Sequence, residues 1–299
     1  MFNNNIELTG LIRTRGMATM QRSTIAGLVV VACLVTGAAS ETRKEFRFTV
    51  GPKANIVVDN QYGAITVKPG SANQVVVVAV LHSDKVEVDS SHIGDRLLIE
   101  SHLLNGADAQ SGRIDYELTV PPNVPLNLRS STGPLSVERV QGDLALEGAD
   151  AEVNVRNVGH CHVHVKTMRG NITLTDVHEG HVEINSISGE VHLNSVTGPH
   201  VQVDSGAGKV FYDGNFGSSG TYAFTTHTGD IEALIAADAS ADFSARSMQG
   251  FVQSDVPLTP KEHNRFPTEL GRSFFGTVGK AASEVVFKSF SGKIRLKRR

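Results

Sequence analysis

The sequence predicts an all-β fold, a β-solenoid or β-helix-like stack of short strands with about 19–21 residues per coil. The first observation is a repeated motif: Ser or Thr, two further residues and Gly, followed by apolar residues at alternate positions. The second is a constant spacing of this motif, and the third is the absence of an amphipathic helical pattern after residue 40. The copies of the motif are Ser130–Gly133, Thr167–Gly170, Ser186–Gly189, Ser205–Gly208, Thr226–Gly229, Ser247–Gly250 and Ser289–Gly292.

The spacing of the motif is nearly constant. Gly170, Gly189 and Gly208 follow one another at 19 residues, and the next two intervals are 21. A corner between two strands needs a tight bend, which Gly adopts without steric cost, and a Ser or Thr hydroxyl can bond a turn amide. One copy, Gly148–Ala151, keeps the spacing but ends in Ala. We therefore expect an altered corner at this copy.

Aligning the repeats gives each coil two short strands with apolar residues in register. Residues two apart in a strand face the same side, so these positions should point inward together and form ladders. The aligned series are Val153, Ile172, Val191 and Val210; Val155, Leu174, Leu193 and Tyr212; Leu144, Val163, Val182 and Val201; and Leu146, Val165, Ile184 and Val203.

The chain divides into three parts by pattern. Residues 41–127 read as an N-terminal region of antiparallel-style β-strands, and residues 128–299 hold the β-strand repeats. The continuous apolar run Val75–Val80 predicts a strand covered on both faces. Near residues 256–284 the repeat lapses into a segment rich in Pro and Gly, which predicts a loop insertion. Residues 41–299 are expected to form one continuous domain.

Residues 1–40 have the features of a secretory signal peptide. Three Arg precede the 11-residue apolar run Ile25–Val35, and small residues up to Ser40 come before polarity returns. Translation from Met17 or Met20 would give a signal of more ordinary length. The run is shorter than the ~20 apolar residues that span a bilayer. Residues 30–33 are also similar to a lipobox, so cleavage, lipidation of Cys33 and retention as an anchor all remain open.

Each of these three outcomes places the folded part outside the cytoplasm, in the periplasm, the cell envelope or the medium. Signal cleavage would leave Cys161 as the only cysteine, so the exported domain has no intramolecular disulfide to rely on. Net charge is −3, and no basic stripe is interleaved with aromatic residues. Nucleic acid is therefore not an expected partner.

Three motifs occur in a characteristic order: Asp59–Val67, the stretch Leu118–Gly133 with its Pro121-Pro122 pair, and Ser289–Leu296. With these motifs, the chain from about residue 44 to its end resembles the bacterial adhesin-like β-strand-repeat proteins of unknown function, the DUF4097-like group. The resemblance implies an exported β-solenoid-like domain. It implies no catalytic residues, because the family has no accepted reaction.

Histidine is the most suggestive residue type for chemistry. His162, His181 and His200 recur at intervals of 19, each immediately before an inward Val, and Asp143 lies in the same column. We expect a vertical ladder on the outer face. Stacked imidazoles can bind Zn²⁺, Cu²⁺ or Ni²⁺, but side chains of neighbouring rungs point in parallel, so no metal site is assigned. Below the ordinary histidine pKa of ~6.5 the ladder would become three stacked cations and destabilise these coils.

Three further features are read as structural. Cys161 lies two residues before Val163 on the inward face and is expected to be a small buried residue. The charged run Asp84–Asp89 alternates as a half-exposed strand and fits no Ca²⁺ loop. Phe211 should face outward with Tyr212 inward, unless the register slips near Asp213.

The sequence favours an exported, non-enzymatic cell-envelope protein: a rigid β-repeat scaffold for adhesion, or for binding an envelope protein or surface polymer. It assigns no catalytic, cofactor-binding or metal-binding residue. One alternative is a carbohydrate-active β-helix enzyme, which needs clustered carboxylates, whereas Glu183 and Glu190 have no evident acidic partners. Another is a sensory or regulatory ectodomain, if the N-terminal segment is an anchor. Contact with a membrane is expected only through that anchor or a lipidated Cys33.

Overall fold

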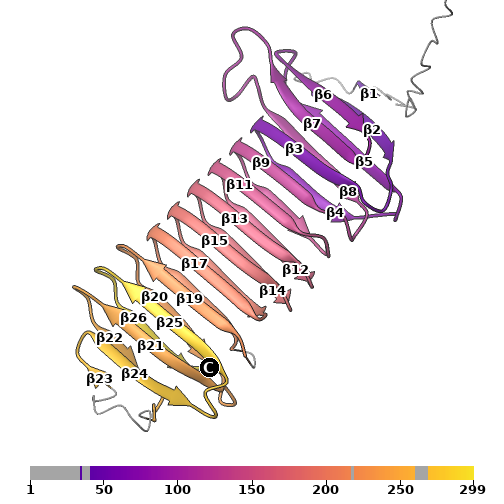
Figure 1. Cartoon of the computed structure of the whole chain (residues 1–299). Helices are drawn as coiled ribbons and strands as arrows, with labels where there is room; N and C mark the ends of the chain where they lie inside the picture. Colours follow the sequence, from indigo (N-terminus) through magenta and orange to yellow (C-terminus); the bar gives the residue numbers. More distant parts are fainter. Residues whose placement is uncertain (1–33, 36–40, 217–218, 260–268) are drawn as a thin grey trace, which may run out of the picture.

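The computed structural model describes residues 34–35, 41–216, 219–259 and 269–299. These residues form 26 strands arranged in two sheets of 13 strands each, sheet A and sheet B, which face each other along an elongated stack (Figure 1). No helix long and apolar enough to span a membrane is found in this part of the chain. The predicted signal region, with Met17, Met20 and Cys33, lies outside the described residues except for positions 34–35.

The strands alternate between the two sheets in most of the chain. Sheet A contains, in spatial order, β1 (Leu34–Val35), β2 (Thr42–Thr49), β5 (Gln74–Leu81), β8 (Ile114–Val120), β4 (Ile65–Pro69), β10 (Leu135–Glu138), β12 (Val153–Gly159), β14 (Ile172–His178), β16 (Val191–Thr197), β18 (Val210–Asn215), β20 (Ile231–Ile235), β26 (Ile294–Arg298) and β22 (Val252–Ser254). Sheet B contains β23 (Glu269–Leu270), β24 (Ser273–Val278), β21 (Ala241–Ser247), β25 (Ser283–Ser289), β19 (Thr221–Thr226), β17 (His200–Ala207), β15 (His181–Ser188), β13 (His162–Arg169), β11 (Leu144–Asp150), β9 (Leu126–Thr132), β3 (Asn55–Tyr62), β7 (Arg96–Leu103) and β6 (Val86–Ile93).

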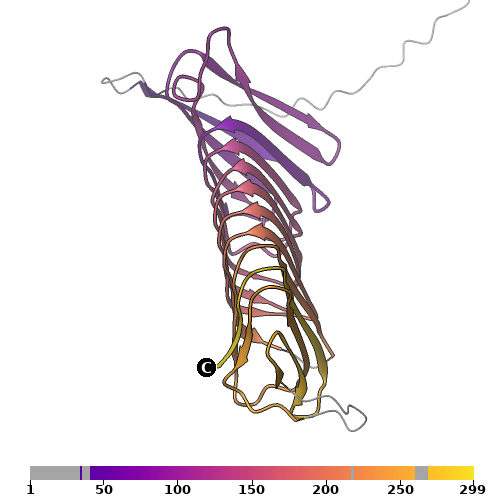
Figure 2. The same cartoon turned by 90° about the vertical axis from the view of Figure 1, so that its left-hand side faces the viewer.

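The predicted 19-residue register is confirmed in the middle of the stack. In sheet A, Ile172 pairs in parallel with Val153 on one side and with Val191 on the other. In sheet B, Val182 pairs with Val163 and Val201. All of these side chains are buried in one continuous core, and successive coils follow one another as rungs (Figure 2). No coil could bury its apolar face alone, so neighbouring coils stabilise each other.

The glycine corners have a steric cause that reaches from one coil to the next. Gly170, Gly189 and Gly208 have φ values of +122°, +123° and +115°. A Cβ atom on Gly189 would overlap the carbonyl oxygen of Gly170, and one on Gly208 would overlap that of Gly189. At these three corners Gly is therefore required both by its own backbone angle and by the close approach of the coil beneath.

The exceptional corner Gly148–Ala151 is altered, as predicted. Ala151 is not among the described residues with positive φ, yet β11 keeps its register with β13. A Cβ atom added to Gly148 would lie 2.6 Å from the Cβ of Ala151. Residue 148, at the Ser/Thr position of the motif, is Gly and has no side chain. This leaves room for the methyl group of Ala151, which stands at the Gly position.

The Ser and Thr hydroxyls of the motif form a buried polar column beside the core. The Oγ atoms of Ser247 and Ser289 accept hydrogen bonds from the amides of Gly250 (3.0 Å) and Gly292 (2.8 Å), as expected for a turn. The Thr226 hydroxyl instead donates to the carbonyl oxygen of Gly229 (2.7 Å). Ser130 Oγ, beside Gly148 in the ladder, has no hydrogen-bond partner among the described residues.

The expectation of antiparallel strands for residues 41–127 is only partly correct. Strands β2, β5 and β6 pair antiparallel with their neighbours, but β3 and β4 form a parallel coil between β7–β8 and β9–β10. Coil stacking therefore begins near residue 55, well before residue 128. The run Val75–Val80 is covered fully on one face only, since β5 alternates buried and half-buried residues.

Asp115 of β8 is the centre of a polar cluster at this end. Its carboxylate accepts hydrogen bonds from Arg113 (2.8 Å), the Ala64 amide (2.8 Å) and His82 (2.7 Å). Burial alone would raise the pKa of Asp115, but these hydrogen bonds outweigh it and hold the pKa below the ordinary value of 3.8.

The C-terminal end differs from the expected loop insertion. The segment near residues 256–284 contains β23 and β24, and β24 pairs antiparallel along β21. The final coil, β25–β26, then inserts between β19–β20 and β21–β22. An open strand edge invites unwanted pairing, and β24 covers the edge that β21 would otherwise expose. Apolar periodicity could not show this antiparallel cover, because the segment does not repeat the motif.

Candidate binding groove on sheet B

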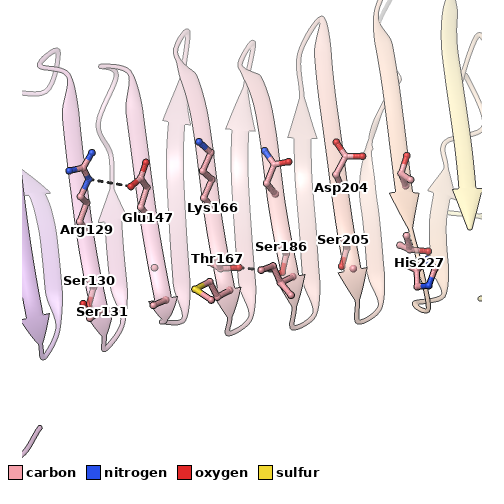
Figure 3. A pocket seen from close by; sticks show the side chains of 18 of the residues that line it. Arg129, Ser130, Ser131, Glu147, Lys166, Thr167, Ser186, Asp204, Ser205 and His227 are labelled. Carbon is pink, nitrogen blue, oxygen red and sulfur yellow. Dashed lines mark hydrogen bonds and ion pairs between the residues drawn. The ribbon is translucent and has the colours of Figure 1, made fainter.

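A shallow groove of about 1080 Å³ crosses seven strands of sheet B. It follows the line of Ser/Thr-x-x-Gly corners from β3 to β19 (Figure 3). Its lining repeats from strand to strand because the 19-residue register brings equivalent positions together. The groove is therefore a direct product of the sequence repeat.

One row of groove residues precedes the Ser/Thr column, and we call it the charged row. Its members, in spatial order, are Asp59, Arg129, Glu147, Lys166, Asn185, Asp204 and Thr225. Arg129 and Glu147 form an ion pair at 3.2 Å. Asp204 accepts a hydrogen bond from Gln202 (2.7 Å), and Lys166 has no ion-pair partner among the described residues. The charges at Lys166 and Asp204 are thus available to a ligand.

The second row follows the Ser/Thr column, and we call it the corner row. Met168 and Ile187 project from it with 56% and 61% of their surfaces exposed. The next position is Gly206, which has no side chain and leaves a notch in the row; a Cβ atom there would lie 2.6 Å from the Ile187 carbonyl oxygen. His227, on the far side of the notch, stacks on Phe290 at 4.9 Å. The corner row therefore offers two exposed apolar side chains, a position without a side chain and a planar ring.

Sequence reasoning missed this groove. The signal was present, because the residues immediately before and after each Ser/Thr also recur every 19 positions. These flanking residues vary in type, however, whereas the periodicity of the sequence is clear only at positions that are apolar in every repeat. The backbone groups of the groove strands are already paired in the ladder, so a ligand meets mainly side chains.

The predicted histidine ladder is present. The rings of His162 and His181 lie 4.8 Å apart and those of His181 and His200 lie 6.0 Å apart. Asp143 accepts a hydrogen bond from the backbone amide of His162 (2.9 Å) and also lies 3.2 Å from the Nδ1 atom of the His162 ring. The hydrogen bond from the backbone amide contributes most to lowering the pKa of Asp143. Within the described ranges, no group of three or more His, Cys, Asp or Glu side chains is arranged to hold a metal ion.

The other singled-out residues also have clear positions. Cys161 is buried, and burial is the main reason that its thiol pKa rises to about 11. Tyr212 points inward, while Phe211 lies half-buried on the outer face. The register does shift opposite Asp213, through an irregularity in β16.

The two carboxylates considered for catalysis do not form a pair. Glu183 lies in sheet B and contacts His164 at 3.2 Å. Glu190 precedes β16 of sheet A and contacts His192 at 2.9 Å. Each carboxylate has its own histidine neighbour, and the two belong to different faces of the stack.

Comparison with known proteins places this architecture in a family. The family model described as Toastrack DUF4097 matches residues 54–297. The chain belongs to this family. None of the curated proteins compared with this Toastrack chain matches it.

Solved structures with partial similarity to this Toastrack chain come from three bacteria. A "putative adhesin" from Bacteroides fragilis shares 11% identity with a TM-score of 0.49, over 87% of this chain and 100% of its own. A "putative cell adhesion protein" from Clostridium sporogenes shares 12% identity with a TM-score of 0.30, over 86% of this chain and 100% of its own. A "putative adhesin" from Parabacteroides merdae shares 11% identity with a TM-score of 0.27, over 85% of this chain and 96% of its own.

Proposed function

We propose that this Toastrack chain is an exported, non-enzymatic protein of the bacterial cell envelope that binds an extended partner along its sheet B groove. The observation that supports this proposal best is the groove itself. It crosses seven strands, and its charged row and corner row run parallel to the axis of the stack. A lining that repeats along one direction suits a long ligand better than a compact one.

The rigidity of the scaffold supports the same proposal. Both sheets are continuous through the groove region, and the residues beneath it are buried in one core. A groove built on paired strands keeps its shape on binding, so little ordering of the protein opposes association. A scaffold of this kind can present a ligand surface without moving parts.

The arrangement of groove side chains favours binding over catalysis. Acid–base hydrolysis of a glycan needs two carboxyl groups about 5–9.5 Å apart with one of them free to donate a proton. In the groove, Glu147 is already paired with Arg129, which lies between it and Asp59, and Asp204 lies three rungs beyond Glu147 in the charged row. The charges are spread along the axis and not gathered around one bond.

Export and binding can be tested on the full chain in a bacterial host. Mass spectrometry of the mature N-terminus and cell fractionation should show removal or lipidation of residues near 33–40 and an envelope or extracellular location. Retention of an unprocessed chain in the cytoplasm would contradict the proposal.

Binding should then be measured to isolated envelope fractions. The double variant Met168→Asp with Ile187→Asp should lose binding, because it replaces the exposed apolar part of the corner row. The matched control Thr173→Asp lies on the outer face of sheet A, at the same level of the stack, and should bind normally. Equal binding by all three proteins would show that the groove is not the binding surface.

A further inference from the structure

We propose that the groove ligand is a peptide segment in polyproline II conformation that carries an acidic and a basic side chain three residues apart. This inference rests on the proposed function, since it takes the groove as a binding surface and names its occupant. Three properties of the groove lead to it: its paired backbone, the spacing of its free charges and the shape of the corner row.

The groove offers a ligand almost no backbone partners. The strands that line it are interior members of sheet B, so their amide and carbonyl groups bond to the strands on either side. A β-strand ligand would leave its own backbone groups unpaired here, which is costly once water is excluded. A polyproline II segment makes no internal backbone hydrogen bonds, keeps its backbone solvated and docks through side chains.

The spacing of the available charges matches the repeat of this conformation. Lys166 and Asp204 are separated by two strand steps, with Asn185 between them, which corresponds to about 9.6 Å. A polyproline II helix repeats every three residues, a rise of about 9.3 Å, and so presents residues i and i+3 on one face. An extended β-strand brings side chains to one face every two residues, at about 6.8 Å or 13.6 Å.

The signs of these charges restrict the chemistry of the ligand. Lys166 attracts a carboxylate, and Asp204 attracts a cationic side chain. A polymer whose charges all have one sign would meet repulsion at one of the two positions. A peptide with one acidic and one basic residue satisfies both positions, and it can do so in either chain direction.

The corner row completes the match. Met168 and Ile187 lie beside the interval between the two charges, and their exposed side chains provide an apolar surface for a Pro or Leu. Met is flexible and polarizable, so it adapts to irregular apolar groups. Beyond Ile187 the row has no side chain at Gly206, and the next side chain that lines the groove is the His227 ring.

The test uses fluorescence anisotropy with labelled synthetic peptides and the full chain. The probe is Pro-Pro-Glu-Pro-Leu-Lys-Pro-Pro, in which Glu and Lys are three residues apart. Control peptides replace Glu by Lys, replace Lys by Glu, or shorten the interval to two residues. The probe should bind about tenfold more tightly than each control, because each control loses one attraction or gains one repulsion.

Charge-reversal variants give the decisive result. Lys166→Glu should switch the preference to the peptide with two Lys, and Asp204→Lys should switch it to the peptide with two Glu. Thr173→Glu, on the outer face of sheet A, should leave the original preference unchanged. Unfolding curves of each variant show whether the fold is intact.

Absence of switching in folded variants, or equal binding of the two spacings, would overturn the peptide assignment. If the peptides fail while the Met168→Asp, Ile187→Asp variant still loses envelope binding, the groove remains a binding surface for another ligand class. If neither experiment depends on the groove, the proposed function fails as well. Concentration-dependent self-association abolished by the groove variants would assign the groove to a second copy of this chain and would also overturn the peptide assignment.

Discussion

The corner between β11 and β12 departs from the motif at two positions that compensate for each other, and this can be measured. A Ser at position 148 would place a Cβ 2.6 Å from the Cβ of Ala151. Overpacking of this kind lowers the free energy of unfolding by about 1–3 kcal/mol. Replacing a glycine within a strand raises it by about 0.5–1 kcal/mol, because glycine loses more backbone entropy on folding. Gly148→Ser alone should therefore destabilise the fold by about 1–2 kcal/mol.

The second substitution should reverse this loss. Ala151→Gly alone should cost about 1 kcal/mol through backbone entropy. In the double variant the clash is gone, and the new hydroxyl lies between Ser130 and Thr167 in the polar column. It can give Ser130 Oγ the partner that it lacks among the described residues, worth about 1 kcal/mol. The double variant should thus match the parent to within about 1 kcal/mol, with a coupling energy of about 2 kcal/mol.

Urea unfolding of the parent, both single variants and the double variant measures this coupling. Ala149→Ser is a suitable control, because this neighbouring position faces the groove and should change stability by less than about 0.5 kcal/mol. Additive effects, with the double variant less stable than either single variant, would refute the compensation and the steric explanation of the glycine column.

Two further outcomes are expected. The paired Asp115 carboxylate stabilises the fold above about pH 3.8, and this contribution is lost as the pH falls through its lowered pKa. Asp115→Asn should therefore show a smaller fall in thermal midpoint below pH 4.5 than the parent. An equal fall in both proteins would argue against the cluster. Cys161 should stay unmodified by a thiol reagent at pH 8 until the protein unfolds, whereas rapid labelling of native protein would contradict its burial.

The middle of the stack could be predicted from sequence because one rule governs it. Most inward positions are aliphatic and most corners are glycine, so Ile172, Val191 and Val210 identify their own neighbours. The histidine ladder followed from the same register. The burial of Cys161 could be predicted as well, because Cys161 lies two residues before Val163 and therefore points to the same face.

The ends of the stack and the groove could not be predicted in the same way. The coils β3–β4 and β25–β26 each insert between coils that are not their neighbours in sequence, and alternation alone gives no partner for a strand. Strand β5 has apolar residues on both faces although only one is fully covered, because it lies near the end of sheet A. The groove depends on Lys166, Asp204 and the gap at Gly206, which differ in type and become related only through position.

Successive coils add one strand spacing along a common axis, and distance measurement between spin labels can test this stacking. In a Cys33→Ser, Cys161→Ala background, labels at Asn154 and Arg295 are separated by five strand steps in sheet A, and labels at Asn154 and Gln253 by six. Stacked coils should give distances of about 24 Å and about 29 Å, so that Arg295, the later residue in sequence, is nearer to Asn154 than Gln253 is. A broad distribution, or a longer distance to Arg295 than to Gln253, would contradict the stacked order.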